Sequence, residues 1–507
     1  MATVTSDSQT DGYESEYLEF DLAEVDDDDL KAADQLIGML GQEQTYVKEC
    51  DDYFYGRHKT PYTPTESSSE YKALADRAIT NMVPLIISNI AQLLYVEGYI
   101  PSKSKELGQN SKSFDEDWNR NRMQIRQRQL IRGALRYGVA YSVQYKDDED
   151  KPAVRLVSPS KMMAGFADPA NDERPAFALE RIGTRKTTEK YILWRHDGTY
   201  RDLSRTEVKG RDGKTRWVWN KPGDPTESGL PHCAVIRHTY DLDIDGRYVG
   251  EIRPIVTLQD RLNQTVMDRL LVQTYGSFKI RYATGIAIDS EEDRIRMSKS
   301  RMLIGEIADA KFGSLPETPL DGFIKSVGVD QETISAISSI PPHYLTGELN
   351  NLGAEAIAEA RAAMEAKAKE IKDALAEGIK MIMRDLAYLR GDMEDAEDYG
   401  ASVVWHDAQN RSLSQVADAL GKLATMLKVP VQELWSKIPG VTRGDVRRWT
   451  KALEKNQMAA MAFEAEEGMN EEIERDDPNA VESDDEAPTR SSGRVDQSSS
   501  GTRAPTT

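Results

Sequence analysis

The sequence lacks the features by which membrane and secreted proteins are recognised. It has only two cysteines in 507 residues, Cys50 and Cys233, and they are too far apart in sequence to indicate a disulfide framework. It has no run of about 18 apolar residues, so we expect no membrane-spanning helix. Its acidic N-terminus is unlike a secretory signal. These features predict a protein made in the cytoplasm, without membrane contact.

Catalytic signatures are missing as well. None of the six histidines forms a pair with helical metal-ligand spacing, and the two cysteines lack zinc spacing. There is no Gly-x-Ser-x-Gly nucleophile elbow. The segment Gly213-Lys214-Thr215 comes nearest to a phosphate loop, but Val208 stands where the first glycine should be. We therefore expect no enzyme and no cofactor.

Two weaker sequence signals each allow two interpretations. Asp241, Asp243 and Asp245 begin like a calcium loop, but Ile252 takes the place of the final bidentate glutamate, so a solvated turn is favoured over a divalent-ion site. Trp217 and Trp219 lie beside Arg216, somewhat as in a base-stacking platform. Their alternation is more typical of a half-buried strand.

Net charge is small in the body and concentrated at the ends. Residues 1–29 hold eleven acids and no Lys or Arg, and residues 464–486 have a net charge of −11. The body, 30–463, has a net charge of −1 although the whole chain has −21. Segments of this composition cannot bury a core, so 1–29 and 464–507 are predicted to be disordered acidic tails. A near-neutral body is not a basic nucleic-acid binder.

Hydrophobic periodicity predicts a helix-rich α+β body. Helices are expected over 30–55, 70–97 with a kink at Pro84, 118–137, 251–276 and 321–340. Strands are expected over 139–145, 153–157, 176–182, 190–195, 216–220, 234–238, 278–282, 302–307 and 402–405. Start signals at Ser412, Pro430 and Thr442 predict three further short helices.

The longest predicted helix covers 354–390. Apolar residues recur at steps of three or four from Ile357 to Leu389, first as Ala and Met and later as Ile and Leu. Small residues in its first half would suit packing against another copy of the helix, and the alternative is a long core helix of a monomer. A Gly/Asn-containing segment, 341–353, precedes it. This order suggests an assembly.

Three strings in this order resemble the portal, or head-to-tail connector, proteins of tailed double-stranded DNA bacteriophages. They are Glu251–Ile255 with Leu258-Gln259-Asp260 and Asn263; Ile340–Leu345; and Trp405-His406-Asp407 with Ser412, Ala417–Ala419, Lys422-Leu423 and Val429-Pro430. The resemblance covers about residues 45–460.

The resemblance implies a regional division of the chain. Residues 30–250 would form the wing, 251–275 and 321–340 the two stem helices, 276–320 the clip, 341–353 the channel loop, 354–404 the long helix with a return strand to the wing, and 405–463 a crown-like helical region. Stem packing would use Ile255, Leu258, Leu262, Val266 and Leu270. The channel-loop residues would be His343, Tyr344, Leu345, Thr346, Gly347, Glu348, Leu349, Asn350, Asn351, Leu352 and Gly353.

The resemblance also implies an assembly and its partners. Such proteins form a ring of twelve subunits at one vertex of the virion capsid, and double-stranded DNA passes through it without sequence recognition. Terminase, the major capsid protein and a head-tail adaptor would be partners, and the protein itself would hydrolyse nothing. Another phage head component, an adaptor or minor capsid protein, is the alternative, and a packaging enzyme is a further one.

Overall fold

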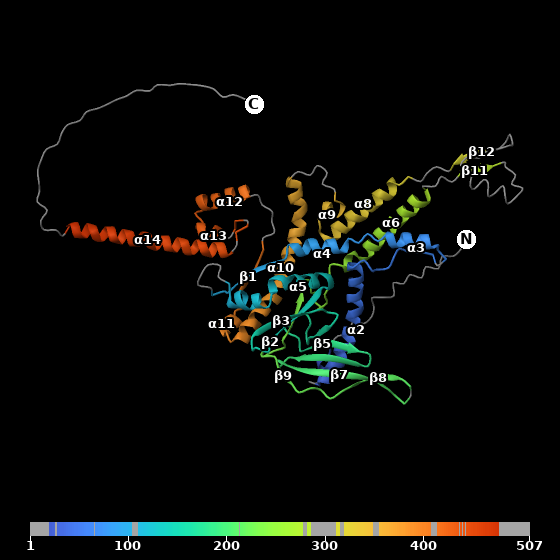
Figure 1. Ribbon diagram of the computed structural model, residues 1–507, viewed down its shortest axis with the longest axis horizontal. Coiled ribbons are helices and arrows are strands. Elements are labelled where there is room, and N and C mark those ends of the chain that lie inside the picture. Colours follow the sequence, from blue (N-terminus) through green and yellow to red (C-terminus); the bar gives the residue numbers. More distant parts are fainter. Residues whose placement is uncertain are drawn as a thin grey trace, which may run out of the picture. The chain divides into compact units, whose positions relative to one another are not determined.

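The computed structural model describes residues 20–25, 28–64, 66–103, 110–211, 213–276, 281–284, 311–314, 319–347, 354–406 and 413–475 without 436, 439 and 442. The chain divides into two compact units, 1–408 and 409–507. Figure 1 shows the first unit as a mixed body of helices and sheets. Each unit is described by itself below.

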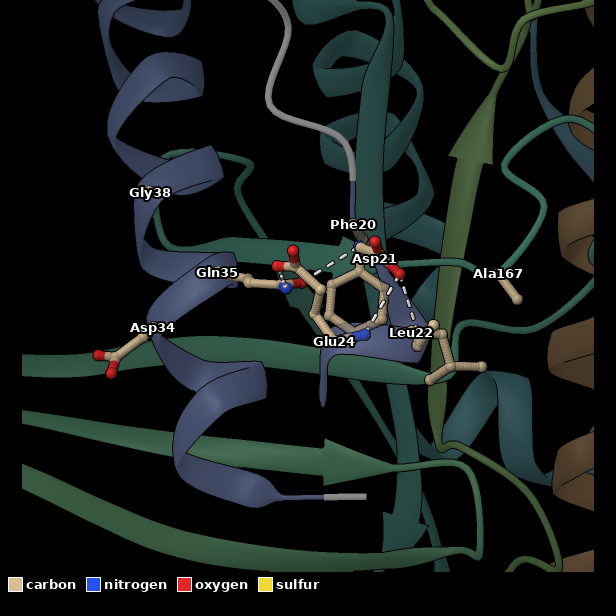
Figure 2. A pocket seen from close by; sticks show the side chains of 9 residues that line it. Phe20, Asp21, Leu22, Glu24, Asp34, Gln35, Gly38 and Ala167 are labelled. Atoms are coloured by element: carbon tan, nitrogen blue, oxygen red, sulfur yellow. Dashed lines mark hydrogen bonds between the residues drawn. The ribbon is translucent and has the colours of Figure 1, made fainter. Parts of the chain in front are cut away.

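The first unit opens with helices α1 (Leu22–Val25) and α2 (Asp29–Phe54). Phe20 and Val25 are buried, and the Asp28 carboxylate accepts the backbone N–H groups of Leu30 and Lys31 as an N-cap. Figure 2 shows Gln35 of α2 beside this segment, where its Oε1 accepts from Asp21 N at 3.2 Å. The predicted disorder of 1–29 is therefore wrong for Phe20–Val25 and for Asp28 and Asp29. Two apolar anchors and a cap outweigh the acidic composition, and residues 1–19 lie outside the described part.

The largest sheet has the order β4-β5-β6-β7-β8, all antiparallel, and a short strand β9 also pairs with β7. The strands are β4 (Met162–Gly165), β5 (Phe177–Arg185), β6 (Thr188–Arg195), β7 (Thr199–Lys209), β8 (Thr215–Trp219) and β9 (Thr226–Glu227). Helix α2 packs its buried face, with Leu36 and Leu40, against Phe177, Leu193 and Leu203. Strands β5, β6 and β8 confirm predictions, whereas β4, β7 and β9 were not predicted.

Two smaller sheets complete the β structure of the body. One has the order β10-β2-β3, from β10 (Val235–Thr239), β2 (Val139–Lys146) and β3 (Pro152–Val157), all three predicted. The other joins β1 (Val96–Ile100) to β13 (Ser402–Trp405), so the predicted strand over 402–405 is confirmed.

The predicted helix over 70–97 is wrong as one element. The chain forms α3 (Ser69–Arg77), α4 (Val83–Gln92) and then strand β1. Pro84 lies in the first turn of α4, where a missing backbone N–H costs nothing, and so it begins a helix instead of kinking one. The break at 78–82 is fixed by side chains of a distant helix, described below.

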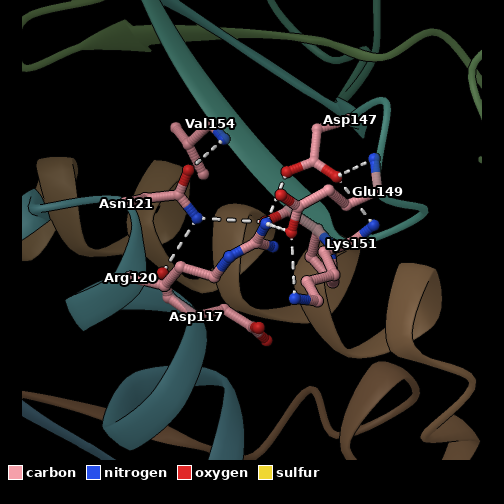
Figure 3. A network of polar contacts seen from close by, with 8 residues as sticks. Asp117, Arg120, Asn121, Asp147, Glu149, Lys151 and Val154 are labelled. Carbon is pink, nitrogen blue, oxygen red and sulfur yellow. Dashed lines mark hydrogen bonds and ion pairs between the residues drawn. The ribbon is translucent and has the colours of Figure 1, made fainter.

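The helix expected over 118–137 also starts differently. A π-helical turn, Ser113–Trp118, precedes α5 (Met123–Tyr137), and Arg122 between them has a left-handed φ of 55°. Figure 3 shows how polar groups hold this break: Asn121 Oδ1 accepts from Val154 N at 2.8 Å, and Arg120 is paired with Asp147 at 2.5 Å. The turn is thereby tied to the hairpin of β2 and β3.

Helix α10 (Ala354–Arg390) has the predicted bounds. Its second half runs through the core, where Ile379, Ile382, Leu386 and Leu389 are buried. Gly378 lies against His238 of β10, which is fully buried and whose Nε2 lies 2.7 Å from Ser142 Oγ. For this half, the expectation of a long core helix is therefore confirmed. A short helix α11 (Met393–Ala396) follows.

Between the body and α10, the chain forms a 3₁₀ turn (Arg253–Ile255), α6 (Val256–Gly276), strands β11 (Arg281–Thr284) and β12 (Lys311–Ser314), α8 (Asp321–Ser338) and α9 (Pro342–Thr346). Strands β11 and β12 form an antiparallel pair. Strands were predicted over 278–282 and 302–307. Only 281–282 of those residues are described, and β12 lies later than the second prediction.

The second unit contains α12 (Leu413–Met426), α13 (Val431–Trp435) and α14 (Arg443–Arg475). The three predicted helices are present, with Pro430 just before α13. Trp435 and Trp449 pack edge to face at a centroid distance of 5.8 Å. Because α14 extends to Arg475, the predicted disorder of 464–507 is wrong for 464–475. Strong helix formers such as Glu and Ala sustain the helix despite the charge, and 476–507 lie outside the described residues.

Candidate assembly site: the paired helices and the start of α10

The predicted stem residues lie on the buried side of α6. Ile255, just before α6, and Leu262 and Val266 within it are buried, while Leu258 and Leu270 are partly buried against the same core. Their partners include Ile334 of α8 and residues of α10. The sequence therefore identified the correct face of this helix. That face is already filled by the subunit's own chain.

Polar contacts fix α6 against α8. Arg261 Nε lies 2.7 Å from Asp330 Oδ1, and the Thr265 hydroxyl donates to Asp330 Oδ2 at 3.0 Å. Asp330 is buried, and these two partners satisfy both of its carboxylate oxygens. The pair of helices is thus locked in register by one carboxylate.

The polar residues of the string at 258–263 clamp the break between α3 and α4. Gln259 Nε2 donates to Thr80 O at 2.8 Å, and its Oε1 accepts from Met82 N at 2.9 Å. Asn263, one turn later, accepts from Thr80 N at 3.0 Å. Both side chains are buried. They satisfy the backbone groups that the interrupted helix leaves without partners.

A second layer ties the clamp to α2 and its following loop. The Tyr53 hydroxyl donates to Asp260 at 2.9 Å, and Tyr53 stacks on His58 at a centroid distance of 4.5 Å. His58 Nε2 lies 2.8 Å from Asn263 Nδ2. Burial lowers the pKa of His58, which favours the neutral imidazole that can accept from this amide.

Helix α8 has three large aliphatic side chains that the subunit leaves about half exposed. Ile324, Val329 and Ile337 are 55%, 57% and 47% exposed. Val329 and Ile337 are eight residues apart and so lie on neighbouring sides of the helix, whereas Ile324 is five residues from Val329 and lies on another side. We call Val329 and Ile337 the outer α8 face. Large aliphatic side chains that are exposed side by side mark a surface suited to a protein contact.

The predicted channel loop is partly helical. His343, Tyr344, Leu345 and Thr346 lie in α9, so the prediction of a loop is wrong for these four residues. Pro342 at the helix start and Gly347, with φ 73°, at its end delimit the helix. Leu345 is buried, which anchors the turn. The remaining residues of the loop, Glu348–Gly353, lie outside the described part.

The first half of α10 uses its small-residue stripe within the subunit. Met364, Ala368 and Ile371 are buried in the hydrophobic core that also contains Leu262 and Ile334. The expectation that these positions pack against another copy of α10 is therefore wrong for them. Lys367, between them, pairs with buried Glu251 at 2.6 Å and so fixes α10 to the start of the α6 segment.

The weaker chemical signals prove to be turns. The Asp243 carboxylate accepts the backbone N–H groups of Asp245 (2.9 Å) and Arg247 (2.7 Å), as in the predicted solvated turn. Gly213 belongs to the hairpin between β7 and β8. Within the described residues, no group of three or more His, Cys, Asp or Glu side chains is placed to hold a metal ion. None of the described helices is long and apolar enough to cross a bilayer.

Burial perturbs several titratable groups in the body. It raises the pKa of Cys50 and of Cys233 to about 12, so both thiols stay protonated near neutral pH. It also raises the pKa of Glu43 to about 7, against a hydrogen bond with Tyr248. The buried oxygen of Glu43, Oε1, has no hydrogen-bond partner among the described residues. Because burial disfavours the charged form of Glu43, the stability of the body should depend on pH.

Comparison with known proteins was made by sequence and by structure. The family model described as "Phage portal protein, SPP1 Gp6-like" matches residues 35–465. No curated protein sequence is significantly similar to the chain. A chain of a solved structure titled "Neck of native GTA particle computed with C12 symmetry" is 11% identical, with a TM-score of 0.42 over 75% of this chain and 96% of that one. A TM-score this low supports no argument about family or function, so the family assignment rests on the match of the family model to the sequence.

Proposed function

Because the chain belongs to the SPP1 Gp6-like family of phage portal proteins, we propose that copies of it form a ring, of twelve subunits, at one capsid vertex. Double-stranded DNA would be packaged and ejected through that ring. The match across residues 35–465 carries this proposal, since it includes the body, the paired helices and α10. The protein acts as a structural conduit, and the energy for packaging comes from a separate motor enzyme.

The regional roles follow the order of elements. In this proposal, 30–250 form the wing, α6 and α8 the stem, and 276–320 the clip on which terminase and then a head-tail adaptor dock. The major capsid protein surrounds the ring. Segment 341–353 contributes to the channel wall, with α9 as its anchored part and 348–353 nearest the DNA. Residues 405–463 form the crown.

The outer α8 face supports the subunit contact. Within one subunit, the buried side of α6 and α8 is already filled, whereas Val329 and Ile337 remain about half exposed. Burying two such side chains between neighbours would stabilise each contact by about 1.5–3 kcal/mol. The neighbouring subunit is the partner that a closed ring supplies on every stem.

Assembly can be tested at this face. The double substitution Val329→Glu and Ile337→Glu should convert rings into monomers, measured by native mass spectrometry and by imaging for a central hole. Circular dichroism should be unchanged, because both side chains are exposed. The control is Ile244→Glu at a turn position that is 92% exposed, which should still assemble. A charge at Leu262 would be uninformative, because that buried residue supports the subunit itself.

Rings formed by the double variant would exclude the outer α8 face as the contact. Native protein that remains monomeric at every concentration would argue against the conduit. No specific observation on the described residues favours a second candidate function.

A further inference from the structure

The charged residues of helix α5 are all positive. Met123–Tyr137 contains four arginines and no acid, in a chain whose net charge is −21. Two of the arginines are held inside the subunit, because Arg126 donates to a backbone carbonyl of β3 at 2.9 Å and Arg136 pairs with a carboxylate of α2. The other two, Arg128 and Arg132, are exposed and make no hydrogen bond or ion pair with any described residue.

An exposed isoleucine shares one side of α5 with these two arginines. Ile125, which is 71% exposed, lies three residues before Arg128 and seven before Arg132. Gln129 is exposed among them. Arg128 also lies over the ring of Tyr95, with its guanidinium carbon 5.9 Å from the ring centroid, and a contact with a ring face uses none of its N–H donors. We call Ile125, Arg128, Gln129 and Arg132 the basic α5 face.

A cavity of about 210 Å³ lies where the start of α6, the end of α8 and the first half of α10 meet. Its apolar lining includes Val249, Ile255, Ile337 and Ile371. Val249 is 42% exposed and Ile337, of the outer α8 face, is 47% exposed, so the cavity lies at the surface of the subunit. Pockets that bury a small-molecule ligand are larger, about 300–1,000 Å³, so this cavity is better suited to a side chain of another protein.

The charged lining of the same cavity is mainly acidic. It consists of Asp241, Glu251 and Glu370 against one cation, Lys367. Glu251 and Lys367 are paired at 2.6 Å, so these two charges offset each other. Asp241 and Glu370 are exposed, and neither makes a hydrogen bond or an ion pair with a described residue. We call the cavity with these two carboxylates the acidic pocket.

The basic α5 face and the acidic pocket are complementary. Each combines exposed aliphatic side chains with two charges of one sign, and the two signs are opposite. The four charges have no ion-pair partner within the described part of the subunit, so the two surfaces do not pair inside one chain. In a ring of identical subunits, each contact joins two different patches, one from each neighbour. The two surfaces are therefore suited to meet between neighbouring copies.

We propose that the basic α5 face of one subunit docks on the acidic pocket of its neighbour. Ile125 enters the apolar cavity, and the two arginines pair with the two exposed carboxylates. This inference rests on the proposed function, since it requires the ring, and it identifies the partner of the outer α8 face at Ile337. Opposite charges around an apolar contact fix partner and orientation more than they add affinity. The pairing thus makes successive subunits join in one direction round the ring.

Two charge-reversed variants of the full chain test the pairing. The first has Arg128→Glu with Arg132→Glu, and the second has Asp241→Arg with Glu370→Arg. Each variant alone places like charges opposite one another, so the dissociation constant of each contact should rise by about tenfold or more, and native mass spectrometry should show loss of rings.

An equal mixture of the two variants should form rings again, because every contact then joins opposite charges when the variants alternate. An alternating ring closes only if the number of subunits is even, as in the proposed ring of twelve. Its mass should show equal numbers of the two variants. This result would distinguish a contact between two different patches from a contact between two copies of one patch.

A matched control separates the pairing from an effect of net charge. Lys31→Glu with Lys72→Glu reverses two exposed lysines of α2 and α3 and changes net charge by the same amount as the first variant. It should form rings as the native chain does. Circular dichroism of all variants should match that of the native chain, because every replaced side chain is exposed.

Several outcomes would overturn the pairing. Native rings combined with failure of the mixture to assemble would exclude it and leave the conduit proposal standing, as would normal rings of either variant alone or equal loss of rings in the lysine control. If the first variant forms rings but loses binding to a labelled 20-base-pair duplex, the partner of the basic α5 face is DNA. A native chain that forms no rings would instead refute the conduit proposal, and the pairing with it.

Discussion

Gly378 provides the sharpest test of how α10 is fixed in the subunit. It lies in the interior of a 37-residue helix, where glycine ordinarily costs about 1 kcal/mol relative to alanine. A Cβ placed there would lie 2.3 Å from His238 Nδ1 and 2.9 Å from its Cε1. His238 cannot withdraw easily, because it is fully buried and its Nε2 lies 2.7 Å from Ser142 Oγ.

The expected magnitude follows from two opposing effects. Gly378→Ala should favour folding through the higher helix propensity of alanine. Its added Cβ, however, overpacks the site, which lowers the free energy of unfolding by about 1–3 kcal/mol. Gly41→Ala in α2 is a matched control, because a Cβ there meets nothing within 4 Å. The propensity term is common to both variants, so Gly378→Ala should be less stable than Gly41→Ala by about 1–3 kcal/mol. That difference is about 2–12 °C in thermal midpoint at equal assembly state.

A double variant identifies the cause. Replacing His238 with Ala removes the ring that clashes, so Gly378→Ala should cost much less in that background than in the native one. Thermal unfolding of the four proteins gives the coupling directly. If Gly378→Ala is as stable as Gly41→Ala, or if its cost is unchanged without His238, then close packing of β10 on α10 is not what requires glycine.

Two further predictions concern a buried carboxyl group and the channel segment. Burial raises the pKa of Glu43 from 4.5 to about 7, so the folded state retains this proton longer than the unfolded state, and about 3 kcal/mol of stability should be lost as pH rises from 4.5 to 7. Glu43→Gln should not lose this stability, so the amount by which its thermal midpoint exceeds the native midpoint should grow as pH rises to 7. A difference between the two midpoints that stays constant across that range would contradict this prediction. Changing Leu349 and Asn350 to Lys should leave rings intact but slow DNA packaging, because the added cations would bind passing phosphates. Normal packaging rate and DNA length in particles with this ring would exclude 348–353 from the channel wall.

Elements with strong local signals were predicted well from the sequence. The bounds of α10 were correct because an unbroken apolar stripe begins after Gly353 and ends before Gly391. The break between α3 and α4 was missed because Gln259 and Asn263, about 180 residues away, hold it. Strand β7 was missed because Leu203 is its one buried residue.

The candidate site was predicted in part for similar reasons. The periodicity of α6 correctly gave the buried face with Leu262 and Val266. Periodicity could not show that the partner of this face is the same chain. The helix α9 did have a signal, Pro342 at its first position and Gly347 after its end. The glycines and asparagines of 341–353 favoured the prediction of a loop instead.

The string that resembles portal proteins has a physical meaning in this fold. Gln259, Asp260 and Asn263 each bond a group from α2 or from the segment between α2 and α4. Replacing one such buried partner leaves the other without a hydrogen bond, at a cost of about 1–3 kcal/mol. A leucine in place of Gln259 or Asn263 would fill the space but could not bond the backbone groups in the break between α3 and α4. The three polar residues therefore fix how α6 joins the body. In the proposed ring of identical subunits, that join has to be the same in every copy, so we expect these residues to act through the geometry of the joint.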